Sequence, residues 1–225
     1  MAFTVTLSAP VASGVTLNLD SAFGTARAAD FTPISGATVS CAASSTTAQT
    51  VNVAINNDAL DENDETFSLA LTNLVATGDV TLGAAAATGT ILDDDATPSL
   101  TITNQSQPEG NAGTSTMTFT VNLSAVSGRD VSFSRATVDG TATVGNNDYV
   151  ALAPQTLSIL AGSTSLTIPV TINGDTVFEG NESFTVALTG ISNATPATLS
   201  GTGTLEEDDQ QPTTTTITGD TPDPT

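Results

Sequence analysis

The chain has 225 residues, of which 38% are hydrophobic and 4% aromatic, so one large or two ordinary domains can form cores of Val, Leu, Ile and Ala. Asp and Glu number 24 against three Arg and no Lys, and the net charge of −21 argues against binding to nucleic acid or to anionic membranes, because both need basic side chains. The chain has no His and a single Cys, which removes the usual general base, the common Zn²⁺ ligand and any intramolecular disulfide.

The first strand-like stretch is FTVTLSA at 3–9, where apolar and polar residues alternate. The same alternation returns at 51–55 and 67–71. An alternation with period two predicts strands that have one buried face. An acidic loop, NDALDENDE at 57–65, lies between these two strands, and LDDD at 92–95 closes the pattern.

The rest of the chain repeats this order. FTVNLSA at 119–125 matches residues 3–9 at an offset of 116 residues. INGDTVFEGNESFTVALTG at 172–190 matches the acidic loop and its strands at 117, and GTLEEDD at 203–209 matches the closing acids at 114. A near-constant offset in the same order indicates one fold used twice. We place the boundary between the two copies near Ala96.

Each copy predicts an all-β domain. About seven short strands in roughly 110 residues are typical of an antiparallel, immunoglobulin-like β-sandwich, and a closed barrel is the less favoured alternative. The second copy opens with TPSLTITNQSQPEGNAG at 97–113, which has no counterpart in the first. We therefore predict a sandwich at 1–96 that lacks its first strand, a complete sandwich at 97–210 and an extended C-terminal segment at 211–225.

The carboxylates cluster at predicted strand ends and loops, and their positions recur between the copies. The acidic loop and the closing acids meet at one end of a sandwich if their strands are antiparallel neighbours. Crowded carboxylates repel one another, and a hard cation relieves this; Ca²⁺ takes six to eight oxygen ligands, and Mg²⁺ ranks second. The alternatives are acids that only solvate loops and a carboxylate pair for glycoside hydrolysis, which the scarcity of aromatic residues disfavours. We expect no catalytic residues and no enzyme activity.

Four elements of the second copy resemble the Calx-β domain. They are Gly-Thr-Ala at 140–142, the Asp-aromatic pair at 148–149, Asp-x3-Glu-x2-Glu-x-Phe at 175–184 and the closing acids at 207–209. The resemblance covers residues 98–209, and residues 2–95 resemble the same domain from its second strand on. Calx-β domains are Ca²⁺-binding β-sandwiches of sodium–calcium exchangers and of large surface proteins and adhesins. The resemblance implies this fold, and Ca²⁺ as the bound ion.

The resemblance also implies a set of Ca²⁺ ligands, which are an acid after the first strand, the acid of the Asp-aromatic pair, two acids of the acidic loop and the closing triplet. In the second copy these are Glu109, Asp148, Asp175, Glu179, Glu207, Asp208 and Asp209. In the first copy they are Asp30, Asp58, Glu62, Asp93, Asp94 and Asp95. Asp223, near the C-terminus, falls where Glu109 would lie in a further copy.

The acidic loops depart from the pattern of tight-binding family members, which often carry two consecutive acids there. The first of the two is replaced by Asn57 in the first copy and by Gly174 in the second. The lower ligand charge implies weak binding, with a dissociation constant on the order of 10⁻⁴–10⁻³ M. Glu65 and Glu182 are expected behind the ligands or in solvent.

The C-terminal segment QPTTTTITGDTPDPT resembles the strand that the first copy lacks. Its prolines and Asp223 match the start of the second copy at an offset of 114 residues, whereas Ile217 matches Ile102 at 115. A slip of one residue turns every side chain to the other face unless a bulge absorbs it. We predict that this segment completes the N-terminal domain of a neighbouring copy, which gives a head-to-tail homopolymer. The alternatives are a window from a longer array and a disordered Thr/Pro linker.

Together, these patterns predict an extracellular or cell-surface structural protein that binds Ca²⁺ and forms a fibre by donor-strand complementation. The alternative is a Ca²⁺-binding tandem module of a large adhesin or secreted enzyme without self-assembly. A Ca²⁺ sensor of the exchanger type fits less well, because the acidic loops have lost one acid each. No apolar run approaches 18 residues, so we expect no membrane insertion, and the net charge of −21 gives no reason to expect a nucleic-acid partner.

Overall fold

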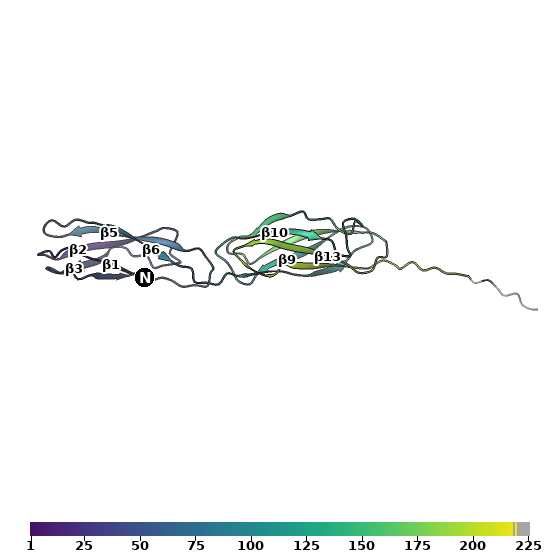
Figure 1. Cartoon of the computed structure of the whole chain (residues 1–225), viewed down its shortest axis with the longest axis horizontal. Coiled ribbons are helices and arrows are strands. Elements are labelled where there is room, and N and C mark those ends of the chain that lie inside the picture. The colour runs from purple at the N-terminus through teal and green to yellow at the C-terminus, as the bar shows by residue number, and fades with distance from the viewer. Residues whose placement is uncertain (218, 220–225) are drawn as a thin grey trace, which may run out of the picture. The chain divides into compact units, whose positions relative to one another are not determined.

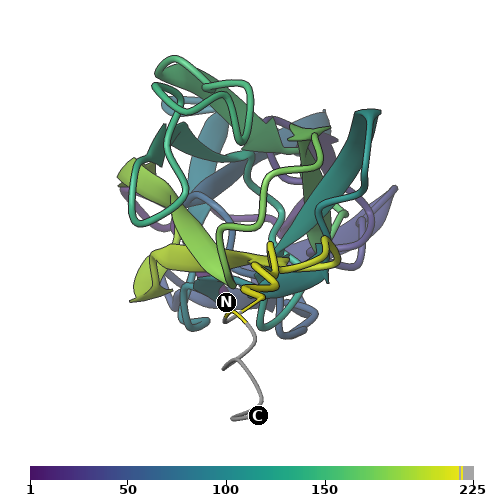
Figure 2. The ribbon, with the colours of Figure 1, turned by 90° about the vertical axis from the view of Figure 1, so that its right-hand side faces the viewer.

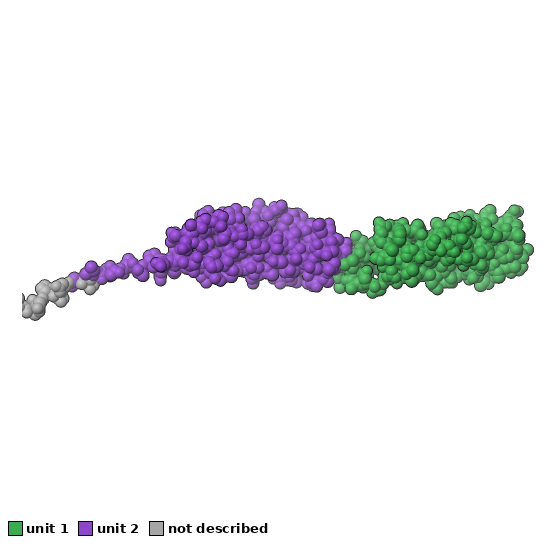
Figure 3. Space-filling view, turned by 180° about the vertical axis from the view of Figure 1, so that it is seen from behind, with its two compact units in different colours: residues 1–96 green, residues 97–225 purple. Residues whose placement is uncertain are grey.

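The computed structural model describes residues 1–217 and 219, and the chain divides into two compact units (Figure 3). Unit 1 is Met1–Ala96 and unit 2 is Thr97–Thr225. The regular elements of the described residues are all β-strands, as the alternation predicts. The same residues contain no helix long and apolar enough to cross a bilayer.

Unit 1 contains two sheets whose neighbouring strands are all antiparallel (Figure 1). The smaller sheet pairs β1 (Ala2–Val5) with β4 (Gln49–Asn52). The larger sheet has the order β3-β2-β5-β6 and consists of β2 (Val15–Phe23), β3 (Ala37–Cys41), β5 (Glu65–Val75) and β6 (Ala86–Ile91).

The described residues of unit 2 form nine strands in two sheets. Figures 1 and 2 show the ribbon in two views. One sheet has the order β12-β9-β7-β14, formed by β7 (Ser99–Ile102), β9 (Gly113–Leu123), β12 (Ser165–Gly174) and β14 (Thr195–Thr198). The other has the order β11-β10-β13-β15-β8, formed by β8 (Gln105–Pro108), β10 (Val131–Val138), β11 (Gln155–Ile159), β13 (Glu182–Ser192) and β15 (Ser200–Glu206).

The strand number and direction of unit 2 differ from the expected seven antiparallel strands. The predicted first strand crosses from one sheet to the other and is therefore divided into β7 and β8, and the last one is divided in the same way into β14 and β15. Because the first and last segments run in the same direction, the β7–β14 and β8–β15 pairs are parallel. The two-sheet arrangement is that of a sandwich, not of a closed barrel.

Each unit packs a cluster of aromatic residues between its sheets. In unit 2 the ring of Tyr149 stacks on Phe184 with centroids 4.3 Å apart, and Phe119 meets Phe184 edge to face. In unit 1 the rings of Phe31 and Phe67 stack at 4.4 Å. The repeat in the sequence is therefore a repeat in the core, and it places the loop before each central Phe at the same end of each unit.

Candidate metal centres

The acidic loop of unit 1, which connects β4 to β5, is tied to the segment that carries Asp30. The backbone N–H of Asn56 donates a hydrogen bond to the carbonyl oxygen of Asp30 at 2.9 Å, and its side-chain amide donates to the carbonyl oxygen of Ala29 at 2.8 Å. Within the loop, a carboxylate oxygen of Asp58 accepts from the N–H of Leu60 at 2.9 Å. Two segments that are far apart in the sequence thus present acids to one space.

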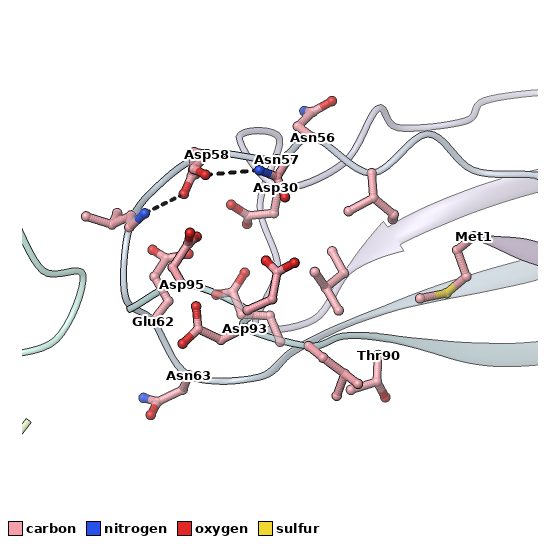
Figure 4. A pocket seen from close by; sticks show the side chains of 16 residues that line it. Met1, Asp30, Asn56, Asn57, Asp58, Glu62, Asn63, Thr90, Asp93 and Asp95 are labelled. Atoms are coloured by element: carbon pink, nitrogen blue, oxygen red, sulfur yellow. Dashed lines mark hydrogen bonds between the residues drawn. The ribbon is translucent and has the colours of Figure 1, made fainter. Parts of the chain in front are cut away.

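These segments and the end of β6 enclose an acidic pocket of about 350 Å³ in unit 1 (Figure 4). In Figure 4 the side chains of Asp93, Asp95 and Glu62 point toward one another across this pocket. Carboxylate oxygens of Asp30, Glu62 and Glu65 lie within 4.8 Å of one another. The pocket is lined by every acid predicted for this copy, which are Asp30, Asp58, Glu62, Asp93, Asp94 and Asp95.

Unit 2 gathers the equivalent acids. Carboxylate oxygens of Asp148, Glu179 and Glu182 lie within 4.8 Å of one another, and Asp148 is buried. Asp148 is held by the backbone N–H of Thr143, which donates to its carboxylate at 2.6 Å. Glu109 lies near these acids, and burial followed by the charges of Asp175, Glu179, Asp148 and Glu207 raises its pKa to about 7.

The closing acids of unit 2 connect the two ends of the site. One oxygen of Glu207 accepts from the N–H groups of Glu179 and Gly180 at 2.6 Å, and the other accepts from Asp209 at 2.7 Å. These backbone hydrogen bonds, that from Asp209 first, lower the pKa of Glu207. Asp208 accepts from the N–H of Gly110 at 3.1 Å, next to Glu109. The triplet therefore fixes both the acidic loop and the turn after β8.

Crowding of the carboxyl groups raises the pKa of some of them in both clusters. Burial, followed by a hydrogen bond with Asp30, raises the pKa of Glu65 to about 7; burial and a hydrogen bond with Asp148 do the same for Glu182. Two carboxyl groups can be hydrogen-bonded to each other only if they share a proton. A divalent cation at the same place would replace that proton and neutralise both groups. The donor set consists of oxygens, which fits Ca²⁺.

The sequence prediction expected Glu65 and Glu182 behind the ligands or in solvent, and the structure brings their carboxylates into the two clusters. The reason is strand parity. Glu65 lies two residues before Phe67, and Glu182 two before Phe184, so each points to the same inward face as the central Phe. A further acid that the prediction left out is Asp61, which is buried. Burial, and then the charges of several acids including Asp61, raise the pKa of Asp95.

The departure from the family pattern at Gly174 has a steric cause. A Cβ atom at Gly174 would collide with the carbonyl oxygen of Gly110, so the backbone of β12 packs against the turn that carries Glu109. An acid cannot be accommodated there without displacing that turn. Asn57 takes the equivalent place in unit 1 and lines the pocket. The remaining predicted ligand, Asp223, lies outside the described residues.

Comparison with known proteins identifies the repeat. The family model of the Calx-beta domain matches residues 1–95 and again residues 97–217. Among solved structures, the chain is similar to CBD12 from CALX1.2, with 18% identity, a TM-score of 0.41 and coverage of 91% of this chain and 92% of that one. It is also similar to the apo form of the Calx CBD1 domain, with 22% identity, a TM-score of 0.42 and coverage of 49% and 98%.

A further similar structure is the calcium binding domain CBD12 of CALX1.1, with 18% identity, a TM-score of 0.38 and coverage of 85% of this chain and 72% of that one. No curated protein sequence matches the chain. The two matches to the family model together span nearly all of the described residues, one in each unit. The chain therefore belongs to the Calx-beta domain family, a family of Ca²⁺-binding β-sandwiches, and contains two such domains in tandem.

Proposed function

We propose that this chain is an extracellular structural protein in which each Calx-beta domain binds Ca²⁺ at its acidic end. The observation that carries the proposal is the convergence of acids from separate segments. In each unit the acid of the Asp-aromatic position and two acids of the acidic loop have carboxylate oxygens within 4.8 Å of one another, and in unit 1 the closing acids line the same pocket. Such a group is stable only with bound protons or with a cation. The proposed role is not catalytic.

The bound ion would act on the loops. In unit 1 it would join the Asp30 segment, the acidic loop and the end of β6, which meet in the pocket. In unit 2 it would join the same elements to the turn that carries Glu109. Cross-linking of loops by an ion that binds only the folded state stabilises that state by mass action. A structural protein outside the cell, where Ca²⁺ is abundant, would gain rigidity in this way.

Isothermal titration calorimetry with CaCl₂, and in parallel with MgCl₂, tests the proposal. We expect one class of sites to be lost in Glu65→Gln and the other in Glu182→Gln, because each variant removes one carboxylate from one cluster. Asp79→Asn, which changes an acid of unit 1 outside the cluster, is the matched control and should bind as the parent does. Unchanged Ca²⁺ binding in both cluster variants would disprove the assignment.

We also propose that the protein assembles head to tail into a surface fibre by donor-strand complementation. The support comes from chain order. The closing acids of unit 1 are followed by β7, the first strand of unit 2. The closing acids of unit 2 are followed in the same way by residues 211–217, which lie outside any sheet. This order supports the proposal that the segment serves as the first strand of a domain in another copy.

Sedimentation velocity and negative-stain electron microscopy of the full chain test the assembly, with a chain shortened to residues 1–210 as the control. We expect the full chain to form linear species that grow with concentration, and the shortened chain to stay monomeric. A full chain that stays monomeric at all concentrations would favour the alternative, a Ca²⁺-binding module of a larger adhesin or secreted enzyme.

A further inference from the structure

Unit 1 contains an apolar groove of about 510 Å³ between β1 and residues 79–87. Side chains of β2 and β5 line it, including Leu17 and Leu71, and Val5 and Leu7 line it from the β1 side. The groove is therefore part of the space between the two sheets. Core side chains of unit 1 reach the surface there.

The same place in unit 2 is filled. Phe119 and Val121 of β9 are fully buried, whereas their counterparts in unit 1, Phe3 and Val5, are only half-buried. The difference is due to β7, which lies beside β9 with Leu100 opposite Leu123 and Ile102 opposite Val121. Both β7 side chains are buried, Leu100 completely and Ile102 to within 4% exposure. The groove of unit 1 is the space that these two side chains would occupy.

The backbone edges beside the groove are also free to pair. In unit 2, β9 pairs with β7 and β15 pairs with β8. Their counterparts in unit 1, β1 and β6, each have a single partner strand among the described residues. An extended segment in the groove would thus form hydrogen bonds with β1 and bury apolar side chains on β2 and β5 at once.

Residues 211–217 have the features of such a segment. They carry no charged side chain, which suits entry into an apolar groove, and they are exposed along their whole length. Ile217 is 93% exposed, the most exposed large apolar side chain of the described chain. The position of this segment after the closing acids is the position of β7, which fills the groove of its own unit.

We propose that residues 211–217 of a second copy occupy this groove in the register that places Ile217 opposite Val5, where Ile102 lies opposite Val121 in unit 2. The inference rests on the proposed head-to-tail assembly and specifies its contact. The competing register keeps Pro212 at the place of Pro98 and puts Thr216 opposite Val5. That register leaves Ile217 on the outer face, because neighbouring strand residues point to opposite sides.

The extra residue that the Ile217 register requires can be accommodated before the strand begins. Pro98 precedes β7, which starts at Ser99, so one more residue between the proline and the strand leaves the ladder intact. Two contacts must adjust, however. A Cβ atom at Gly201 would lie 2.6 Å from the carbonyl oxygen of Thr103 and 3.0 Å from Cγ1 of Ile102, and unit 1 has Ala87 at the place of Gly201. The donated strand must therefore lie slightly farther from β6.

Fluorescence anisotropy with a labelled synthetic peptide of residues 211–225 tests the inference. The acceptor is the chain shortened to residues 1–210, measured in millimolar CaCl₂ and, in parallel, in EDTA. Exchange of the two residues, Thr216→Ile with Ile217→Thr, is the decisive peptide variant. We expect this exchange to weaken binding about 10- to 100-fold, the effect of withdrawing one Ile side chain from an apolar site. Ala87→Gly in the acceptor should strengthen binding of the original peptide.

Ala87→Leu provides the blocked acceptor. Ala87 is exposed at the groove, so the larger side chain can be placed there without disturbing the packed core, and it should abolish peptide binding and stop growth of the full chain. Tighter binding of the exchanged peptide would overturn the register. Peptide binding that survives Ala87→Leu, or no binding at all, would overturn the groove as the site. Fibres that persist in full-length Ala87→Leu would likewise refute this contact, while head-to-tail assembly itself would stand.

Discussion

Calcium binding by this protein should release protons, and the amount should differ between the two units. At pH 7 a carboxyl group whose pKa is about 7 is half protonated. Unit 2 has two such groups, Glu109 and Glu182, whereas unit 1 has one, Glu65. A cation that requires ionised ligands must displace these protons. We therefore expect about one proton per ion from unit 2 and about half a proton from unit 1 at pH 7.

The pH dependence follows from the same pKa values. At about pH 8.5 the groups are already ionised and the release should approach zero, whereas at about pH 6 it should approach two protons for unit 2 and one for unit 1. Titration calorimetry in buffers of different ionisation enthalpy measures the release directly. Glu65→Gln and Glu182→Gln, each of which silences one unit, assign the values. Binding at pH 6 without proton release would refute the view that crowding keeps these carboxyls protonated.

The same pKa values predict how the stability of the metal-free protein depends on pH. Because the folded-state pKa of Glu65, Glu109 and Glu182 lies above the usual 4.5, the folded state holds these protons more tightly than the unfolded state. Stability is therefore highest below about pH 4.5 for these groups and is lost as the pH rises through about 7. The full shift corresponds to about 3 kcal/mol per group, and solvent screening reduces it to about 1 kcal/mol.

Two further predictions concern packing, and one concerns the ion. Gly174→Ala should lower the stability of unit 2 by about 1–3 kcal/mol and weaken its Ca²⁺ binding, because the new Cβ meets the carbonyl of Gly110. The control is Asn57→Ala, at the equivalent position of unit 1. Equal effects of the two variants in calorimetry would contradict the steric argument. Phe184→Ala should cost about 3–5 kcal/mol, since its ring contacts both Tyr149 and Phe119, whereas Phe178→Ala, at a partly exposed ring, should leave the unit 2 transition in place. Ca²⁺ at about 100 times its dissociation constant should stabilise each unit by about 2.7 kcal/mol, seen as a Tm that EDTA reverses; a Tm insensitive to Ca²⁺ would mean that the ion does not prefer the folded state.

The sequence predicted the fold well because two independent signals agree. Alternation marked the strands, and the repeat showed that both halves use them in one order. The division of the first strand into β7 and β8 could not be predicted, because the residues on both sides of Thr103 and Asn104 read as one extended run. Which sheet each half joins depends on the free edges of β9 and β15, and these are tertiary features.

The candidate site was predictable in outline and not in its details. Antiparallel neighbours bring the acidic loop and the closing acids to one end, so their meeting follows from topology. The places of Glu65 and Glu182 were available from strand parity, since each shares a face with the central Phe. The way in which Glu207 holds the acidic loop was not, because two of its three backbone hydrogen bonds come from Glu179 and Gly180 and depend on the conformation of that turn.

The parallel pairing of β8 with β15 has a mechanical consequence. These strands stand near the two ends of unit 2 in the sequence, and they run side by side in the same direction, from Gln105 beside Gly203 to Pro108 beside Glu206. When the chain is pulled at the N-terminal end of β8 and at the C-terminal end of β15, the two strands are drawn in opposite directions along their length. The hydrogen bonds between them are then loaded in shear, all at the same time. Among the described residues no strand lies beside β6 in the place of β8, so tension should open unit 1 first.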